Sequence, residues 1–232
     1  MATPEITILT ASLGRPSLIG VRNDIEAQTV KDRLKWRIIF DGKAARDAGM
    51  PQVENLNVTN DIIVATTSKS IGHFGLLWSV IDSVNTPYIC IMDDDNRFAP
   101  DHVERLLEGL KTSQFCATSR YYTDEMGLII AKESPESELV DSNCMGIRTN
   151  YFKQVRQFWR DNGESTNFID IQFNLCSLLF GVKPVRLKDA YTVFYKVNPL
   201  RTPPEEYRTE GTEMIFETLS GTFFKVDYGK KL

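Results

Sequence analysis

The stretch TPYICIMDDDNRFAPDHVERLLEGL, residues 86–110, places three aspartates between an apolar run and an amphipathic repeat. The apolar run, YICIMD at 88–93, predicts a buried strand. Apolar residues then recur with helical spacing at Val103, Leu106, Leu107 and Leu110. This repeat predicts a helix with Pro100 as its first residue. The aspartates therefore lie where a buried strand ends and a helix follows.

Three earlier apolar runs also predict strands, each ending in small or acidic residues: EITILTA (5–11), WRIIFDG (36–42) and DIIVAT (61–66). Helical patterns separate them, and the helix before the aspartates is marked by Leu76, Leu77, Val80, Ile81 and Val84. This alternation predicts an α/β fold with a largely parallel sheet. Ligands of such sheets bind beyond the carboxyl ends of the strands. Ser12, Asp41 and the three aspartates should therefore share one crevice.

Beyond residue 112 the pattern predicts mixed α and β structure. Two antiparallel strands joined by a glycine-containing turn are predicted first, QFCATSRYY (114–122) and MGLIIAK (126–132). Two helices and a last strand pair follow, at about 149–160, from Asp170 to Gly181, and in KPVRLKD (183–189) and YTVFYKV (191–197). The chain should therefore contain an α/β half up to about residue 112 and a mixed α+β half after it.

The composition excludes several classes of protein. A net charge of −4 with dispersed basic residues is unlike the basic stripe of a nucleic-acid-binding protein. No apolar run approaches the roughly 20 residues that span a bilayer, and residues 1–8 lack the features of a signal peptide. We therefore expect a cytoplasmic protein with no transmembrane segment and no nucleic-acid partner. The cysteines form no C-x-x-C pair and are expected to be reduced and buried: Cys90, Cys116, Cys144 and Cys176.

Three interpretations account for the aspartate triplet. An acidic turn that caps the next helix needs no ligand. In a metal site, alternation along an extended chain points Asp93 and Asp95 to one side and Asp94 to the other. Two such carboxylates suit Mg²⁺ or Mn²⁺, which share their ligand shell with phosphates and water. A phosphatase of the haloacid-dehalogenase type also has D-x-D after a strand, but on the first strand, whereas here it follows the fourth.

Segments on both sides of residues 86–110 complete a wider pattern: ITILTASLGRP, IIFDG, SKSIGHFGLLWSVIDS and VDSNCMGIRTNYF. In order and spacing they resemble the GT-A glycosyltransferases of family 2, over roughly residues 5–200. The resemblance implies a GT-A fold and transfer of a hexose-type sugar, with inversion, in glycan biosynthesis. A nucleotide-diphosphate sugar, with UDP favoured, would bind residues 1–112. A carbohydrate or glycoprotein acceptor would bind residues 113–198, and Mn²⁺ or Mg²⁺ would be the cofactor.

The resemblance also implies roles for individual residues. The base and ribose would be held by Thr10, Ala11, Ser12, Arg15 and Asp41. Asp93 would contact ribose or metal, Asp94 would hold the loop or the nucleotide, and Asp95 would be the principal metal ligand, bridging to the diphosphate. In STNFIDIQF, Asp170 would be the base that deprotonates the acceptor hydroxyl. An ordinary helix cap is the alternative for Asp170, and the two roles are compatible.

Several positions depart from the family pattern. His73 stands near the place of a phosphate-binding arginine, although a loop histidine bonded to backbone is equally compatible. Asn198 stands where a histidine often completes the metal shell. Residues 199–232 would form a tail or a lid over the diphosphate, with Arg201 as a counter-charge. Candidates to touch sugar or acceptor, or else strand residues that face the core or solvent, are Asp141, Asn143 and Met145.

Two other functions share these features. A nucleotidyltransferase has similar architecture and metal use, but it normally shows a glycine-rich first loop that ends in a basic residue, and a catalytic lysine. The corresponding loop here, TASLGRP, has only Gly14 and Arg15, which argues against this function. A non-catalytic module that binds a sugar nucleotide or a glycan would keep the fold and lack the base. Such a module would bind the nucleotide without turnover.

Overall fold

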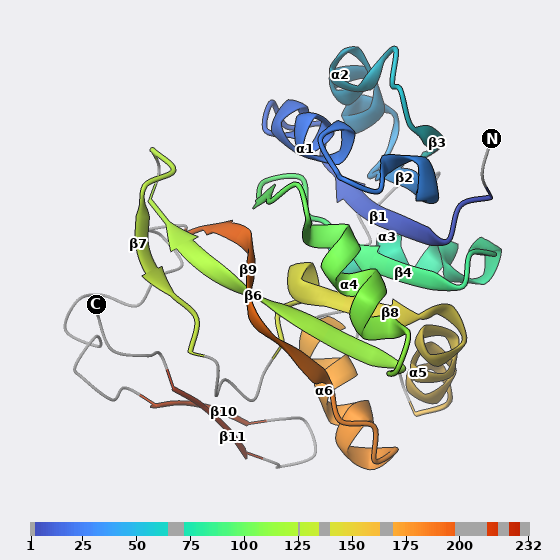
Figure 1. Ribbon diagram of the computed structural model, residues 1–232. Helices are drawn as coiled ribbons and strands as arrows, with labels where there is room; N and C mark the ends of the chain where they lie inside the picture. The colour runs from blue at the N-terminus through green and yellow to red at the C-terminus, as the bar shows by residue number, and fades with distance from the viewer. Residues whose placement is uncertain are drawn as a thin grey trace.

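The computed structural model describes residues 3–64, 72–124, 126–134, 140–162, 169–197, 213–217 and 223–227. Within these residues, nine strands form one sheet in the order β3-β2-β1-β4-β8-β6-β9-β5, with β7 beside β6 (Figure 1). The strands are β1 Ile6–Ser12, β2 Leu34–Phe40, β3 Thr59–Val64, β4 Tyr88–Ile91, β5 Arg97–Phe98, β6 Phe115–Thr123, β7 Ile129–Lys132, β8 Met145–Arg148 and β9 Val185–Lys196. The helices are α1 Leu18–Glu26, α2 Lys43–Val53, α3 Gly72–Val80, α4 His102–Leu110, α5 Thr149–Asp161 and α6 Ile169–Leu179, with short 3₁₀ turns η1 Lys31–Arg33, η2 Ile81–Ser83 and η3 Ser142–Cys144.

The first four strands form the parallel part of the sheet. β1 pairs with β2 and with β4, and β2 pairs with β3, all in parallel. The chain moves outward from β1 to β3 and then returns to the other side of β1 to form β4. The order therefore reverses between β1 and β4, and such a reversal opens a crevice at the carboxyl ends of the two strands.

The second half adds mixed pairings to the same sheet. β8 lies antiparallel between β4 and β6, whereas β9 runs parallel to β6. β5 and β7 pair antiparallel with β9 and β6 at the edge of the sheet. An α/β sheet with a mixed second half was expected, and the structure confirms it.

The structure differs from expectation in β9. Residues 183–197 were expected to form a strand pair, but Val185–Lys196 is one strand along β6. Asp189 has a φ of 54°, and the register against β6 shifts between Ala117 and Arg120. Asp189 therefore marks an irregularity of the β-bulge type within one strand, and the chain does not reverse direction there.

Two other boundaries also differ. α4 begins at His102, with Asp101 at the N-cap position, and Pro100 lies outside the helix. The tail at 199–232 lies mostly outside the described residues; within it, β10 Glu213–Glu217 and β11 Phe223–Asp227 pair antiparallel with each other. A lid over the diphosphate thus stays a prediction.

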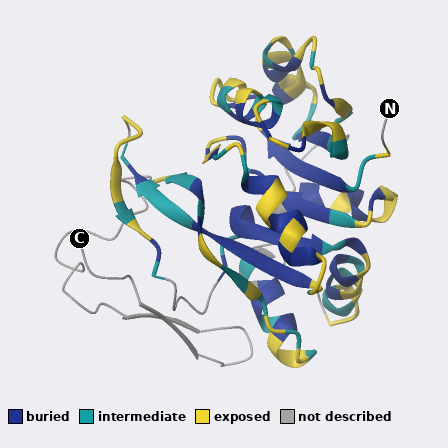
Figure 2. Ribbon diagram, in the orientation of Figure 1, coloured by how far each residue is buried: buried dark blue, intermediate teal, exposed yellow. Residues whose placement is uncertain are grey.

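Two packed faces make the core (Figure 2). On one face, Phe173 of α6 packs 4.6 Å from Phe152 of α5 and 6.0 Å from Trp78 of α3, measured between ring centroids. On the other, α4 approaches so closely that a Cβ on Gly109 would lie 2.9 Å from Cys116. All four cysteines are buried thiols, as expected. No helix among the described residues is long and apolar enough to cross a bilayer.

Candidate active site

The ends of β1 and β4 meet through Ser12 and Asp94. Ser12 Oγ donates a hydrogen bond of 2.7 Å to Asp94 Oδ2, and the Leu13 amide donates to the same oxygen at 3.3 Å. The Asp41 amide, just beyond β2, donates to the Ser12 carbonyl at 3.0 Å. The carboxyl ends of three parallel strands therefore converge at this point, as the shared crevice requires. Asp94 is buried and holds the first loop in place.

Asp95 faces a cation that belongs to the chain itself. Arg15 donates a hydrogen bond of 2.9 Å to Asp95 Oδ2, and its guanidinium also lies 3.5 Å from Asp94 Oδ1. The strand ends at Ile91, and Asp94 and Asp95 form a turn. The extended chain assumed for residues 93–95 is therefore wrong, because Asp94 and Asp95 lie in a turn. Neighbouring carboxylates reach one guanidinium instead.

Gly14 makes this loop possible. Its φ is +73°, and a Cβ there would lie 2.2 Å from the Ala45 carbonyl oxygen of α2. We expect Gly14→Ala to lower the free energy of unfolding by about 1–3 kcal/mol more than Gly127→Ala, because overlap with backbone adds to the strain. Gly127 is the matched control, since its φ is +81° and nothing lies within 4 Å of the built Cβ. Urea unfolding would measure both, and equal losses would show that the close approach carries no cost.

Asp93 is held from the opposite side by Asn143 of η3. The Asp93 amide donates to Asn143 Oδ1 at 2.7 Å, and Asn143 Nδ2 donates to Asp93 Oδ2 at 2.7 Å. Asn143 Nδ2 also donates to Asp141 Oδ1 at 3.0 Å. Asn143 and Met145 are buried and Asp141 is nearly so, so Asn143 and Asp141 support the aspartate turn and Met145 packs in the core.

A buried charge network continues from Asp141. Arg120 of β6 donates to Asp141 Oδ2 and lies beside Glu133, which Arg186 of β9 also approaches at 3.4 Å. Burial disfavours the charge on Arg120, but Asp141 and its other neighbours raise its pKa well above the ordinary value. Burial raises the pKa of Glu133, against the opposing effect of the two arginines. The opposite charges in these ion pairs offset the cost of burying each charged group, and the pairs hold in place the segment that carries Asn143.

Tyr195 of β9 completes the wall on this side. The Arg120 guanidinium lies 4.9 Å from the centre of its ring, within cation–π range. Burial, together with the Asp141 carboxylate, raises the pKa of Tyr195 to about 12, and Asp93 and Asp95 add to the shift. Neither Arg120 nor Tyr195 was predicted from the sequence. An isolated charge within the β-like run QFCATSRYY is the one signal that could have pointed to Arg120.

Asp170 lies in the first turn of α6 and is partly buried. One turn later, Asn174 donates to the Asp170 carbonyl at 2.6 Å and exchanges hydrogen bonds with the backbone of Val140. Val140 directly precedes Asp141. The start of α6 is therefore attached to the segment that holds Asp93.

Other predicted residues are placed differently. Thr10 is fully buried and accepts a hydrogen bond from Trp36 Nε1 at 3.0 Å, and Ala11 is also buried. Both support β1 from within, because their side chains face the core. The His73 side chain, Asn198 and Arg201 lie outside the described residues.

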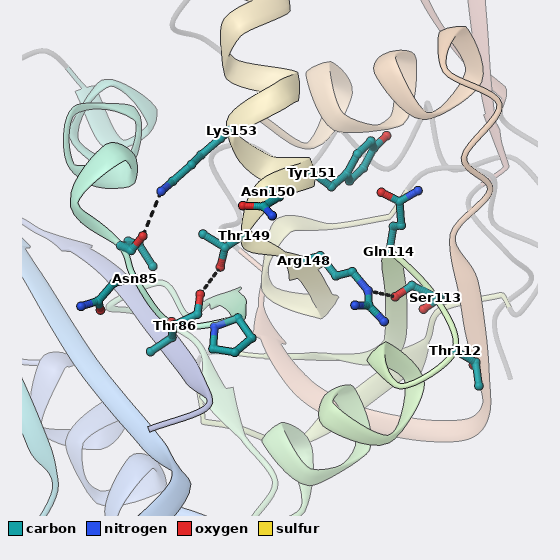
Figure 3. A pocket seen from close by; sticks show the side chains of 12 residues that line it. Asn85, Thr86, Thr112, Ser113, Gln114, Arg148, Thr149, Asn150, Tyr151 and Lys153 are labelled. Carbon is teal, nitrogen blue, oxygen red and sulfur yellow. Dashed lines mark hydrogen bonds between the residues drawn. The ribbon is translucent and has the colours of Figure 1, made fainter. Parts of the chain in front are cut away.

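Two clefts border these elements. The larger, about 670 Å³, is shown in Figure 3. Its lining includes Pro87 and Gln114, which precede β4 and β6, so it lies away from the aspartates that follow β4. Its cations are engaged by backbone: Arg148 donates to the Ser113 carbonyl and Lys153 to the Val84 carbonyl. The smaller, about 370 Å³, is lined by Asp95 together with Ser17, Ile19, Gly20, Asn96, Arg97, Thr123, Asp124, Met126, Gly127, Phe194 and Lys196. The smaller cleft contains Asp95, which favours it over the larger one for chemistry, although Ser12 and Asp41 are not among its lining residues.

The carboxylates of this turn fit a hard divalent cation that shares its shell with phosphates. Within the described ranges, no group of three His, Cys, Asp or Glu side chains forms a complete cage. Mg²⁺ usually needs only one or two carboxylates when phosphates supply further oxygens. The Asp95 carboxylate is half exposed and already opposite a guanidinium that stands in for a cation. Asp93 is hydrogen-bonded to Asn143, and Asp94 is occupied by the first loop.

Glycosyl transferase family 2 matches residues 38–179, more than half of the chain. S. aureus TarS 1–349 in complex with UDP-GlcNAc matches with a TM-score of 0.64 at 12% identity, over 84% of this chain and 59% of that chain. Mannosyltransferase PcManGT from Pyrobaculum calidifontis, in complex with GDP-Man and Mn²⁺, has a TM-score of 0.59 at 13% identity, over 83% and 57%. No curated protein sequence matches the chain.

A further structure shares the fold without glycosyl transfer in its name. The 4-diphosphocytidyl-2C-methyl-D-erythritol synthase from Anaerococcus prevotii has a TM-score of 0.56 at 9% identity, over 79% of this chain and 88% of that chain. At such identities the likeness is one of fold, and this chain spans less than two thirds of the TarS 1–349 and PcManGT chains. The family match, together with the GT-A architecture of these neighbours, shows that the chain belongs to glycosyl transferase family 2.

Proposed function

We propose that this protein transfers a sugar, with inversion and with Mn²⁺ or Mg²⁺, from a nucleotide-diphosphate donor to a carbohydrate or glycosylated acceptor. UDP is the favoured nucleotide. The observation that carries the proposal is the half-exposed Asp95 carboxylate at the switch point between β1 and β4, beside Arg15. Donors of two neighbours, UDP-GlcNAc and GDP-Man, support the ligand class.

In this proposal the donor lies over the carboxyl ends of β1, β2 and β4. Asp41 and the loop that Ser12 anchors would contact the nucleoside, and Asp95, with Asp93, would hold the metal. When bound, the metal supplies positive charge that stabilises the leaving diphosphate. Asn143 and Asp94 keep the aspartate turn in one conformation, which limits reorganisation as charge develops.

On the acceptor side, Asp170 would take the proton from the attacking hydroxyl. The hydroxyl oxygen forms a bond to the anomeric carbon while the bond from that carbon to the diphosphate oxygen breaks on the opposite face. The Asn174–Val140 hydrogen bonds support this role, because they attach α6 to the segment beside Asp93. A base must lie within hydrogen-bond reach of the hydroxyl, and a rigid attachment serves that requirement.

A thermal-shift panel tests the donor proposal. UDP-, GDP- and dTDP-sugars would be added to the protein with Mn²⁺ or with EDTA. We expect one nucleotide class to raise the Tm by several degrees with Mn²⁺ and by much less with EDTA, since a ligand at about 100 times its Kd stabilises by about 2.7 kcal/mol. A panel without any shift would contradict the proposal, and a shift without sugar transfer or donor hydrolysis would identify a binding module.

A further inference from the structure

Arg15 places a positive charge on the aspartate turn before any ligand arrives. Its guanidinium contacts Asp95 Oδ2 at 2.9 Å and approaches Asp94 Oδ1 at 3.5 Å. Adjacent carboxylates repel, so this contact stabilises the turn. In the free protein the counter-charge thus comes from the chain, although the repelling triplet alone suggests that it arrives with the substrate.

The backbone on both sides of Arg15 is fixed. Gln52 Nε2 donates to the Gly14 carbonyl at 3.2 Å, and the Leu18 amide donates to the Arg15 carbonyl at 3.1 Å. The Arg15 side chain, by contrast, is half exposed and is held through its guanidinium. The guanidinium can therefore change partner by rotation of the side chain alone, without movement of the loop.

A divalent cation on Asp95 would meet this guanidinium as a like charge. Two like charges about 4 Å apart near a protein surface repel each other by several kcal/mol before salt screening. The guanidinium and the metal therefore compete for the Asp95 carboxylate. A diphosphate offers the displaced guanidinium a new partner, because arginine forms charge-assisted hydrogen bonds with phosphate oxygens.

We infer that Arg15 pairs with Asp95 in the free protein and with the donor diphosphate in the complex, so that metal and diphosphate bind together rather than separately. The inference rests on the proposed function, because it needs Asp95 to hold the metal. Each ligand then raises the affinity for the other, and Arg15 carries part of that coupling. Metal alone then binds the free protein more weakly, and the nucleotide binds more tightly when metal accompanies it.

The test measures Mn²⁺ binding to the whole protein without nucleotide, from the loss of the free-ion EPR signal. We expect Arg15→Ala to bind Mn²⁺ about three- to tenfold more tightly than the wild type, because a competing surface ion pair is worth about 1 kcal/mol. Arg15→Lys, which keeps the charge, should lie near the wild type. Arg105→Ala removes another exposed, paired arginine from α4 and should leave the affinity unchanged.

A second titration adds the nucleotide that stabilises the wild type in the thermal panel. Arg15→Ala should bind this nucleotide about tenfold more weakly with Mn²⁺ present, since one charged hydrogen-bond partner of the diphosphate is lost. A general loosening of the loop would weaken the binding of both ligands. It would not produce tighter binding of Mn²⁺ together with weaker binding of nucleotide in one variant. Thermal unfolding of the variants checks that the loop remains folded.

The outcomes separate two failures. If Asp95→Asn lowers Mn²⁺ affinity while Arg15→Ala binds Mn²⁺ like the wild type, the metal site stands and the exchange of Arg15 is wrong. If none of these proteins binds Mn²⁺, with or without nucleotide, the metal-dependent function itself is contradicted. Weaker Mn²⁺ binding by Arg15→Ala would also overturn the inference, because it would make Arg15 a support of the site rather than a competitor.

Discussion

Asp95→Ala is expected to lower sugar transfer by about a thousandfold or more, because the leaving diphosphate loses the metal that neutralises it. The side chain of Asp95 is 49% exposed, so its removal leaves the core intact. Exposed ion pairs contribute about 0–1 kcal/mol, and the free energy of unfolding should change by no more than that. The release of nucleoside diphosphate from the donor, in the presence of acceptor and Mn²⁺, measures the loss.

Two variants sharpen this experiment. Asp95→Asn keeps the shape of the side chain and removes its charge, so it should lose transfer nearly as completely as the alanine. Asp101→Ala removes a partly exposed aspartate, paired with Arg105 at the start of α4, and should retain wild-type transfer. Substantial transfer by Asp95→Asn would contradict the role of Asp95 as the principal metal ligand.

Asp170→Asn is expected to abolish transfer while donor binding is retained. An amide cannot accept the proton of the acceptor hydroxyl, and general bases contribute about 10²- to 10⁴-fold to a rate. Because α6 begins at Ile169, Asp170 lies inside the first turn and not at the N-cap, so the capping alternative is wrong; asparagine keeps the size of the side chain and removes only the basic carboxylate. Donor affinity from calorimetry and transfer rates at saturating donor would show an unchanged Kd beside a reduced kcat.

The control for Asp170 is the neighbouring support. Asn174→Ala would break the attachment of α6 to Val140 without touching the carboxylate, and it should lower both stability and transfer. Asp170→Asn should unfold within about 1 kcal/mol of the wild type, because it keeps the size of the side chain and removes a charge near a helix terminus. Transfer that continues at the wild-type rate in Asp170→Asn would show that another group is the base.

The crevice could be predicted from the sequence because it depends on short patterns of neighbouring residues. The strands from β1 to β4 are short segments rich in β-branched and aromatic residues, with helical spacing between them, and the carboxyl ends of parallel strands must lie together. Ser12, Asp41 and Asp94 could therefore be assigned to one place before their contacts were known. The hydrogen bonds among them realise that arrangement.

What the sequence could not predict depends on contacts across long separations. The network around Arg120 joins β6 to Glu133, Asp141 and β9, and no spacing rule links such positions. The predicted alternation of the three aspartates is wrong for a different reason: β4 ends at Ile91, and side chains alternate only along an extended chain. Arg15 was predicted to contact the nucleotide, whereas in the structure its guanidinium donates a hydrogen bond to Asp95.

Calorimetry of nucleotide binding tests the central claim, that Asp95 makes donor binding metal-dependent. The wild type and Asp95→Asn would each be titrated with the stabilising nucleotide, once with Mn²⁺ and once with EDTA. We predict that Mn²⁺ raises the affinity of the wild type by about tenfold or more and leaves that of Asp95→Asn unchanged, a coupling in the range usual for linked ligands. An equal effect of Mn²⁺ on both proteins would contradict the claim, because the metal would then bind without Asp95.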